Sequence, residues 1–487
     1  MTGKTRSVGI GIDYGTSNSA AAIYDGVKVS IIELESTSTV MPSATYVDSE
    51  YKISTGQNGI DTYIEINTGR TVELSAELLG EGRTTTGQLG DKGLPEEAPN
   101  QHIYGQSLVD NGQQGRLFRG IKRLLSSVDK QRIMVFDKPF RLVALITPLL
   151  LRIRASITTS LQKTGINPIV DHACIGHPVN FEGNAMRRND SALKLLSESY
   201  EYAGFLEKSY CPEPIAATLS YLHANPETLS KTLLAVDFGG GTLDFCIIQQ
   251  RSHSFEVIAT HGVGVGGDHI DQLLFKELLF PLLGRGERWR RAGAYREIDT
   301  LFPFEEYEDL LLNWTVSYML NQNKFTAPLM QRIQVGDEAS KKFRRLYDLI
   351  KGNNSYTIFQ AIKNLKAHLS TEDTAVLDVP EIDVEIIVER TRFEEIIKPL
   401  LIEFESAIDY LLADAKIKAE DIDIVLRTGG SSLIPAVKNK LTERFGNKVI
   451  EHDPFTSVAS GLAIAEYNGF NVPAFNNNQI SQASRWT

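Results

Sequence analysis

The sequence predicts a bilobal, duplicated α/β fold, and three observations support this prediction. A short apolar strand that ends in Asp-x-Gly and restarts as a second strand occurs twice, at residues 10–18 and 236–244. Strand and helix patterns and a long inserted segment accompany each copy. With 487 residues, the chain is also too long for a single compact core. Two homologous lobes, each with an inserted subdomain, account for all three.

The first repeat is predicted to be a β-hairpin whose turn can approach a phosphate. Asp13 ends the first strand, and Gly15, Thr16, Ser17 and Asn18 follow it. Glycine and small hydroxyl residues let backbone N–H groups come close to an anion, while the carboxylate can face a hydrated metal. A single turn of this kind is also common in ordinary hairpins.

The second repeat carries a stronger signal, because three glycines stand in a row. Consecutive glycines are costly beside a strand unless something must approach the backbone. Two such hairpins facing each other across a cleft can hold a nucleoside triphosphate between them. The second hairpin contributes Asp237, Gly239, Gly240, Gly241, Thr242 and Asp244.

The rest of the first half alternates between polar and apolar segments. Residues 54–114 are polar with faint apolar periodicity, which predicts an inserted lobe with mobile loops, above all at 80–100. A helix is expected from about Pro148, which suits a first turn, to Gly165. A strand at 169–175 and a helix at 184–202 complete this half.

The second half repeats this order with a more helical insertion. Its predicted elements are a strand at 233–236, a helix carrying Leu273, Leu274 and Leu278, an aromatic-rich helical insertion at 283–359, a strand at 422–428 before Gly429 and Gly430, a helix carrying Ile434, Val437 and Leu441, and a last helix at about 456–466.

These patterns give the expected domain borders. Lobe I is expected at residues 1–205, with its inserted subdomain at about 40–125. Lobe II is expected at 206–467, with a helical inserted subdomain at about 272–400. The Asn- and Gln-rich residues 468–487 are expected to form a disordered tail.

Composition limits the partners and the compartment. The net charge of −11 argues against a general affinity for nucleic acid or anionic membranes. The N-terminus shows no secretory signal, and the apolar run at 142–151 is too short to span a bilayer. Three scattered cysteines, Cys174, Cys211 and Cys246, form neither a disulfide framework nor a zinc spacing. We therefore expect a cytosolic protein.

An arginine cluster between Arg285 and Arg296 has two interpretations. Together with Trp289 it could form a nucleic-acid patch. On an acidic chain, a solvated helix face or a surface for a protein partner is favoured.

Several segments, taken in order, resemble the nucleotide-binding domain of DnaK-type heat shock protein 70 chaperones, in the actin, hexokinase and heat-shock superfamily. They include both hairpins, Ile121-Lys122-Arg123-Leu124 and Glu213-Pro214-Ile215-Ala216-Ala217. The resemblance covers roughly residues 8–467 and looks nearest to the short YegD-like branch. It implies an actin-like ATPase fold with ribonuclease H-like halves.

The resemblance also implies roles for residues that are ordinary on their own. Lys122 would reach the γ-phosphate and the attacking water, although by itself it reads as a surface lysine. Glu213 would be a third carboxylate of the cleft, or simply a charge at a helix N-terminus. Asp13 and Asp237 would hold Mg²⁺ through water, and Thr242 would join Lys122, Glu213 and Asp237 as catalytic residues. Pro178 would serve as a hinge proline, with His177 as a spectator.

The expected nucleotide contacts extend over both lobes. For the segment that follows Gly266 and Gly267, a purely structural interpretation is also open: Asp268 would cap a helix N-terminus, with Asp271 as the acidic residue three positions later. The contacts implied for ATP or ADP are Asp13, Gly15, Thr16, Ser17, Asn18, Gly239, Gly240, Gly241, Thr242, Gly266, Gly267, Lys366, Ser370, Gly429, Gly430, Ser431 and Leu433.

The adenosine side departs from the family pattern. Lys363 stands where the family has a glutamate near the ribose, and Leu433 where it has an arginine that stacks on adenine. Phe455 replaces an acidic residue near the base. Losing a cation–π contact costs about 0.5 to 2 kcal/mol, so base recognition is expected to be altered while phosphate chemistry is retained.

The resulting functional hypothesis is an ATP-binding, slowly hydrolysing, Mg-dependent molecular switch without a peptide-binding domain, since few residues follow Glu466. A nucleotide-binding scaffold without turnover, a small-molecule kinase and an actin-like filament former remain alternatives. No catalytic base for a sugar hydroxyl is identifiable, and the Lys122 and Glu213 segments speak against actin. We expect no nucleic acid or membrane partner; protein partners cannot be named.

Overall fold

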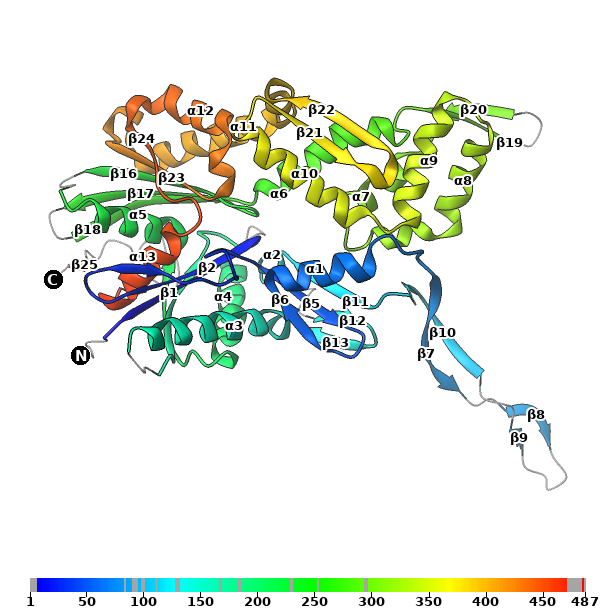
Figure 1. The fold of residues 1–487 in the computed structure, drawn as a ribbon, viewed down its shortest axis with the longest axis horizontal. Helices are drawn as coiled ribbons and strands as arrows, with labels where there is room; N and C mark the ends of the chain where they lie inside the picture. The colour runs from blue at the N-terminus through cyan, green and yellow to red at the C-terminus, as the bar shows by residue number, and fades with distance from the viewer. Residues whose placement is uncertain are drawn as a thin grey trace.

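The computed structural model shows two α/β lobes, one above the other, with the inserted segments at one side (Figure 1). It describes residues 7–82, 85–89, 95–97, 101–110, 112–127, 132–165, 169–181, 186–227, 231–251, 254–292, 297–470 and 484–485. Each lobe has a mixed sheet of its own, as the repeated hairpins predict.

The sheet of the first lobe has the strand order β15-β14-β1-β2-β3. Strands β1 and β2 are antiparallel and form the first hairpin, and β14 and β15 continue the sheet in parallel. The strands are β1 (Gly9–Tyr14), β2 (Asn18–Tyr24), β3 (Val29–Ile31), β14 (His172–His177) and β15 (Glu207–Pro212), with β4 (Met41–Pro42) beside β2. β15 belongs to this sheet and follows the expected lobe border at residue 205 in the sequence.

The sheet of the second lobe has the order β24-β23-β16-β17-β18-β25. Again an antiparallel hairpin, β16–β17, is continued by a parallel strand, β23. The strands are β16 (Thr232–Phe238), β17 (Leu243–Arg251), β18 (Ser254–Val263), β23 (Ile424–Thr428), β24 (Val449–Glu451) and β25 (Ser484–Arg485). Of the tail expected to be disordered, 484–485 pair with β18, and most of the remainder lies outside the described residues.

Alternation along β1 explains how helices cover both faces of the first sheet. Ile10 and Ile12 point into a core shared with α3 (Leu142–Lys163) and α4 (Met186–Tyr202). Gly9 and Gly11 point the other way, where any Cβ would collide with the backbone of α13 (Ser457–Tyr467). The missing side chains therefore let α13 pack directly on the strand.

Two helices join the lobes at the base of the cleft. α5 (Glu213–Ala224) packs against α13 and also contacts β16, while α13 lies on β1 and β14. The three cysteines, scattered in the sequence, meet in the buried cluster between these helices and the two sheets. Small and apolar residues thus form a continuous joint between the lobes.

The helix predicted from Pro148 begins six residues earlier. α3 starts at Leu142, and Pro148 lies inside it. Burial of Leu142, Leu145 and Ile146 outweighs the lost hydrogen bond of an interior proline. Contrary to the expectation from the short apolar run, this one helix among the described residues has the length and composition of a membrane span; nine of its residues are buried within the protein.

The first inserted segment contains a helix that its polar sequence did not predict, and the loops expected at 80–100 lie partly outside the described residues. It holds α1 (Gly56–Asn67) on a small sheet of β5 (Ala44–Asp48), β6 (Ile53–Thr55) and β11 (Gly115–Arg119). A long arm of β7 (Leu74–Gly82), β10 (Gln101–Asp110), β8 (Thr85–Leu89) and β9 (Pro95–Glu97) extends away from the body (Figure 1). The helix was missed because only a few of its side chains, such as Ile60 and Tyr63, are buried.

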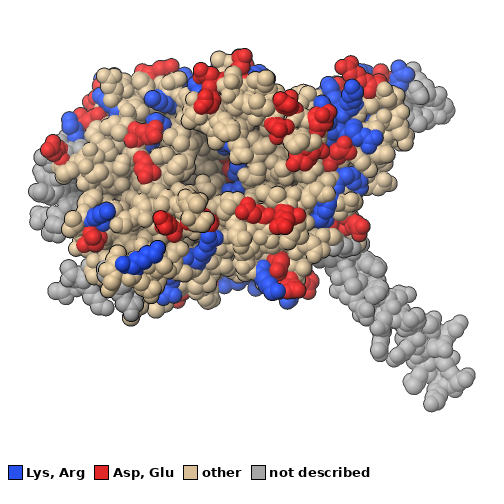
Figure 2. Space-filling model, in the orientation of Figure 1, with Lys and Arg blue, Asp and Glu red and all other residues tan. Residues whose placement is uncertain are grey.

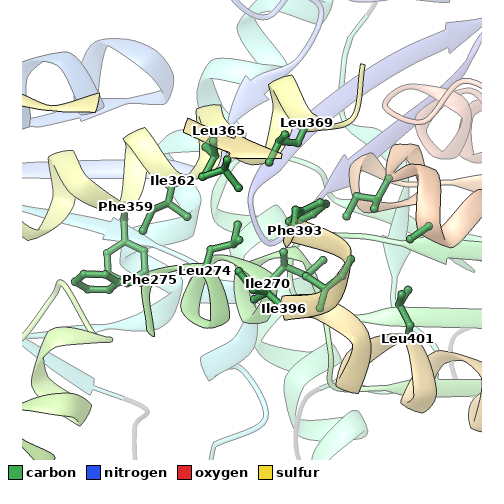
Figure 3. Packing of buried hydrophobic residues seen from close by; sticks show 14 of the residues in the cluster. Ile270, Leu274, Phe275, Phe359, Ile362, Leu365, Leu369, Phe393, Ile396 and Leu401 are labelled. Atoms are coloured by element: carbon green, nitrogen blue, oxygen red, sulfur yellow. The ribbon is translucent and has the colours of Figure 1, made fainter. Parts of the chain in front are cut away.

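The second inserted segment is mainly helical, as predicted. Figure 3 shows Ile362 and Leu365 of α10 (Ser355–Leu369) facing Ile270 and Leu274 of α6 (Gly267–Leu274). The other elements here are β19 (Arg288–Ala292), β20 (Glu297–Leu301), α7 (Glu305–Leu311), α8 (Asn323–Gln334), α9 (Glu338–Lys351), β21 (Thr374–Val379) and β22 (Val384–Glu389). The long α11 (Arg390–Ala415) and α12 (Pro435–Phe445) then cover the second sheet.

The arginine cluster does not form the helix face that we expected. Arg288 and Arg290 lie on strand β19, with Trp289 between them. Trp289 packs on Phe302, with ring centroids 5.4 Å apart, so the alternation of charged and aromatic residues was a strand signal. Arg296 lies outside the described residues.

Candidate functional site

A cavity of about 810 Å³ lies between the two lobes, and we call it the main cavity. Figure 2 shows the surface hollowed between the lobes, with charged side chains inside the hollow. The predicted residues on its wall are Asp13, Gly15, Thr16, Ser17, Asn18, Lys122, Glu213, Asp237, Gly239, Gly240, Gly241, Thr242, Gly267, Lys366, Ser370, Gly429, Gly430, Ser431 and Leu433. Gly266 is absent from this wall, although it adjoins Gly267.

The two glycine turns face each other across one end of the main cavity. The first turn comprises residues 15–17 and the second turn residues 239–242. A Cβ on Gly240 would collide with the Ser17 hydroxyl, and one on Gly241 would lie 2.9 Å from Oγ1 of Thr16. The close approach explains why glycine is needed at these positions.

The second turn is held from behind by α6 and by the segment after β23. The Gly267 N–H donates to the Gly239 carbonyl at 3.0 Å, and the Asp268 N–H donates to the Gly240 carbonyl at 2.9 Å. The Ser431 hydroxyl donates to the same Gly239 carbonyl at 3.0 Å. A Cβ on Gly266 would strike the backbone of Gly240 and Gly241, so this glycine supports the turn rather than lining the cavity.

Lys122 is a buried residue and not the surface lysine that it would be on statistics alone. It lies on the short helix α2 (Ile121–Leu124), and its Nζ is 2.5 Å from Oε1 of Glu213. Glu213 begins α5, with Pro214 in the first turn as predicted. Removing one partner of such a buried ion pair strongly destabilises the folded protein, because the other charge stays buried without compensation.

Four carboxylates gather around this single lysine. Burial, followed by the charge of Glu213, raises the pKa of Asp13 to about 7 despite the opposing effect of Lys122. The pKa of Asp244 is also raised to about 7, mainly by burial, and that of Asp237 lies well above its usual range for the same reason. Burial alone would lower the pKa of Lys122, but Glu213 and Asp13 outweigh it and the pKa rises.

The donor set at this end of the main cavity fits a hydrated divalent cation. Oδ1 of Asp13 is buried and has no hydrogen-bond partner among the described residues. Within the same residues, no three His, Cys, Asp or Glu side chains converge closely enough to ligate a metal directly. Mg²⁺ usually keeps several waters and takes one or two carboxylates, which suits Asp13 and Asp237.

The hinge segment connects to this carboxylate group through the backbone. The Val179 N–H donates to Oδ1 of Asp244 at 3.0 Å, and Pro178 lines the main cavity. Nδ1 of His177 lies 2.9 Å from the Pro178 carbonyl, which agrees with a structural role for this histidine.

The side chains on α6 and α10 form a charged wall. α6 begins at Gly267 with Gly266 as its N-cap, so Asp268 is not the cap that we predicted. Asp268 pairs with Arg123 and with Lys363, whose Nζ is 3.4 Å away. Although burial opposes it, these cations lower the pKa of Asp268 to about 2. Lys366 lies 2.5 Å from Asp271 and donates to the Gly267 carbonyl at 2.8 Å.

The opposite end of the main cavity is lined by both apolar and polar side chains. Leu433 follows the Gly429-Gly430 turn, in which Gly429 has φ +80°, and Phe455 lies beside Gly430. A Cβ on Gly430 would be 3.2 Å from the Phe455 ring. Ser370 donates its hydroxyl to the Lys366 carbonyl at 3.1 Å. A flat, weakly polar ring fits such walls.

Sequence reasoning missed several residues of the main cavity. Arg119 and Arg123 flank the Lys122 segment, and Arg123 donates to the Gly240 carbonyl at 3.3 Å. Arg427, Lys438 and Asn439 line the other end. The motif containing Lys122 already included Arg123, but Arg119 is brought in only by the turn at Gly120, which has φ +66°.

Comparisons with known proteins agree with this architecture. The family model described as Hsp70 protein matches residues 132–281 and 337–467. The chaperone protein DnaK of Psychrobacter cryohalolentis is 25% identical over 473 residues, which cover 93% of this chain and 58% of that protein. The DnaK of Thermoplasma acidophilum is 24% identical over 467 residues, covering 93% of this chain and 57% of that protein.

A plant relative matches a shorter stretch. Heat shock 70 kDa protein 6, chloroplastic, of Arabidopsis thaliana is 28% identical over 304 residues, which cover 61% of this chain and 34% of that protein. The chain thus spans somewhat more than half the length of the DnaK proteins that it matches.

A two-lobed α/β fold with paired glycine turns and a buried lysine among carboxylates is typical of actin-like ATPase domains. Since the family model matches more than half of the chain, the protein belongs to the Hsp70 family, as a distant relative of DnaK. The more specific resemblance to the YegD-like branch stays a prediction.

Proposed function

We propose that the protein binds ATP and ADP with Mg²⁺ in the main cavity and hydrolyses ATP slowly as a molecular switch. The observation that carries this proposal is the facing pair of glycine turns beside Lys122, Glu213, Asp13 and Asp237. Backbone N–H groups of such turns cradle phosphates. Mg²⁺ would neutralise part of the negative charge of the phosphates and of the four carboxylates.

The residues of this chain would have distinct tasks in hydrolysis. The Lys122 ammonium, fixed by Glu213, would stabilise charge that develops on the transferred phosphoryl group. Glu213, Asp237 and Thr242 would orient the attacking water and the hydrated cation. Phosphoryl transfer depends mainly on positioning and charge, which this buried arrangement of Lys122 and carboxylates can supply.

The cycle would move the lobes about their joint. α5 and α13 connect the two sheets at the base of the cleft, and Val179 ties the hinge segment to Asp244. Closing on nucleotide and reopening after hydrolysis is a hinge motion that protein partners can detect. We propose such protein partners and a cytosolic location.

Single-turnover hydrolysis of γ-labelled ATP tests this proposal. Enzyme in excess over ATP should release labelled phosphate in a single, Mg-dependent phase. Stoichiometric ATP binding without phosphate release would instead support a scaffold without turnover. Absence of binding at millimolar ATP would contradict both.

A further inference from the structure

A second cavity, of about 560 Å³, lies between the two inserted segments, and we call it the insert cavity. Its walls come from α1, β11 and α2 on one side and from residues 312–318 and α10 on the other. It shares Ser17, Arg119 and Lys363 with the main cavity, whereas Ser370 and Leu433 line the main cavity alone. The two cavities therefore meet at the end with the glycine turns.

The insert cavity has more cations than its own carboxylates can neutralise. Its wall includes five Arg or Lys and three Asp side chains. Arg70 pairs with Asp110, while Arg123 and Lys363 share Asp268. Among the described residues, this pairing leaves two arginines of the wall, Arg116 and Arg119, outside any ion pair, although the charge of Arg119 contributes to the low pKa of Asp268.

Among the residues that the structure describes, neither Arg116 nor Arg119 has a carboxylate within ion-pair distance. Arg119 donates to the Tyr356 hydroxyl at 3.3 Å and to the Ser17 carbonyl at 3.4 Å. Arg116 donates to the Gln113 amide oxygen at 3.2 Å and to the Met134 carbonyl. Arginines in a cavity that lack counter-ions favour an anionic ligand.

Aromatic side chains form another part of the wall. Trp314 and Tyr356 contact edge to face with centroids 4.7 Å apart, and Tyr63 lies 5.3 Å from Tyr356. Trp314 is half-buried, so part of its ring system is available to a ligand. Aromatic walls beside arginines suit a molecule that carries both a ring and a negative charge.

Contacts between the inserted segments limit the occupant to a small molecule. The Gly69 N–H donates to the Gly352 carbonyl at 2.8 Å. The Asn353 side chain donates to the Asn67 carbonyl at 2.6 Å. These bonds bridge the two segments beside the cavity, and a volume of about 560 Å³ is in the range of small-molecule sites.

A nucleotide in the main cavity would leave these features unused. Its phosphates could meet Arg119, Arg123 and Lys363, but Arg116 and Trp314 line the insert cavity alone. We propose that the insert cavity binds a small organic anion that carries a ring, beside the nucleotide. The proposal concerns a separate ligand and does not depend on ATP hydrolysis.

Calorimetry with phenyl phosphate as the probe tests this second site. The titration is made with protein saturated with Mg-ADP, which keeps the probe away from the glycine turns, and is repeated without nucleotide. Inorganic phosphate supplies the charge without the ring, and benzyl alcohol supplies the ring without the charge. We expect one phenyl phosphate per chain, bound at least roughly tenfold more tightly than either partial probe.

Two substitutions locate the binding. Arg116→Gln and Trp314→Leu should each weaken phenyl phosphate by roughly tenfold or more and leave the Kd for Mg-ADP unchanged. The matched control is Arg288→Gln, because Arg288 is exposed on β19 and pairs with Asp299. Unchanged melting temperatures of the ligand-free variants exclude misfolding as the cause.

Three results would overturn the proposal. They are no phenyl phosphate binding at millimolar concentration, equal binding of inorganic phosphate, and binding that neither Arg116→Gln nor Trp314→Leu weakens. If Mg-ADP itself fails to bind, the nucleotide proposal fails, whereas phenyl phosphate binding that depends on Arg116 would still support the insert cavity as a site.

Discussion

The two ends of the main cavity differ in what builds them. At one end the wall consists of two backbone turns and of charged side chains on β1, α2, α5 and β16. At the other end it consists of side chains from α10 and from the loops after β23 and β24, among them Leu433 and Phe455. Backbone turns tolerate few substitutions, whereas side chains on loops can change without loss of the fold. We therefore expect the first end to keep the family pattern and the second to depart from it.

The largest expected effect concerns Lys122 at the first end. Lys122→Ala should slow single-turnover ATP hydrolysis by roughly 10²- to 10³-fold, as is typical when one electrostatic stabiliser is removed. The affinity for ADP, which lacks the γ-phosphate, should barely change. An equal loss of ADP affinity would show that Lys122 is structural, for example through its pair with Glu213.

The pH dependence of Mg-ADP binding tests whether the buried carboxylates of the first end face a cation. The pKa values of Asp13 and Asp244 are about 7 in the folded protein, against about 4 in the unfolded chain. The folded state thus binds more protons between these values, so these two groups make the ligand-free protein less stable as pH rises from about 4 to about 7.

A divalent cation reverses this trend because it favours the ionised carboxylates. The increase in melting temperature caused by Mg-ADP should grow as pH rises through about 7 and then level off. Asp244→Asn should flatten the profile. An increase that is the same at pH 6 and pH 8 in the wild-type protein would argue against a cation at this end.

An effect of intermediate size is expected on protein stability when Gly266, which packs behind the second turn, is replaced. Gly266→Ala should destabilise the protein by about 1–3 kcal/mol, because the new Cβ meets the backbone of Gly240 and Gly241. Gly239→Ala is the matched control, since its Cβ would be 3.5 Å from the nearest atom, the Thr242 carbonyl oxygen. Chemical denaturation measures the free energy of unfolding of both variants. Equal losses of stability would mean that α6 packs less closely on the second turn than the structure shows.

The smallest expected effect lies at the base end. Leu433→Arg should place a cation beside the nucleotide ring and tighten ATP by about 0.5 to 2 kcal/mol, measured by calorimetry. Inorganic triphosphate, which has no ring, should bind equally to both proteins. If Leu433→Arg binds ATP more weakly, the base lies elsewhere in the protein. Lys366 and Ser370 would then no longer be assigned as adenosine contacts.

The sequence allowed the fold to be predicted where a pattern repeats. The two Asp-x-Gly hairpins predicted both sheets and the facing turns, and the motifs around Lys122 and Glu213 predicted residues that the structure brings to within 2.5 Å. Resemblance was needed there, because nothing in the local sequence marks Lys122 as buried. Helix α1 was missed because its sparse apolar face gives weak periodicity.

Other features depend on contacts between distant segments. Arg119 reaches the main cavity through the turn at Gly120, and the insert cavity forms only where α1 and α10 approach each other. The start of α3 was misplaced because tertiary burial of Leu142 and Ile146 overrides the usual position of a proline. Such features follow from packing and cannot be read from local periodicity.

Calorimetric titration of Mg-ADP into the wild-type protein, with and without Mg²⁺, tests the central claim most directly. The account predicts one binding site per chain and weaker binding when Mg²⁺ is omitted. No heat and no increase in melting temperature at millimolar Mg-ADP would contradict the assignment of the main cavity as a nucleotide site.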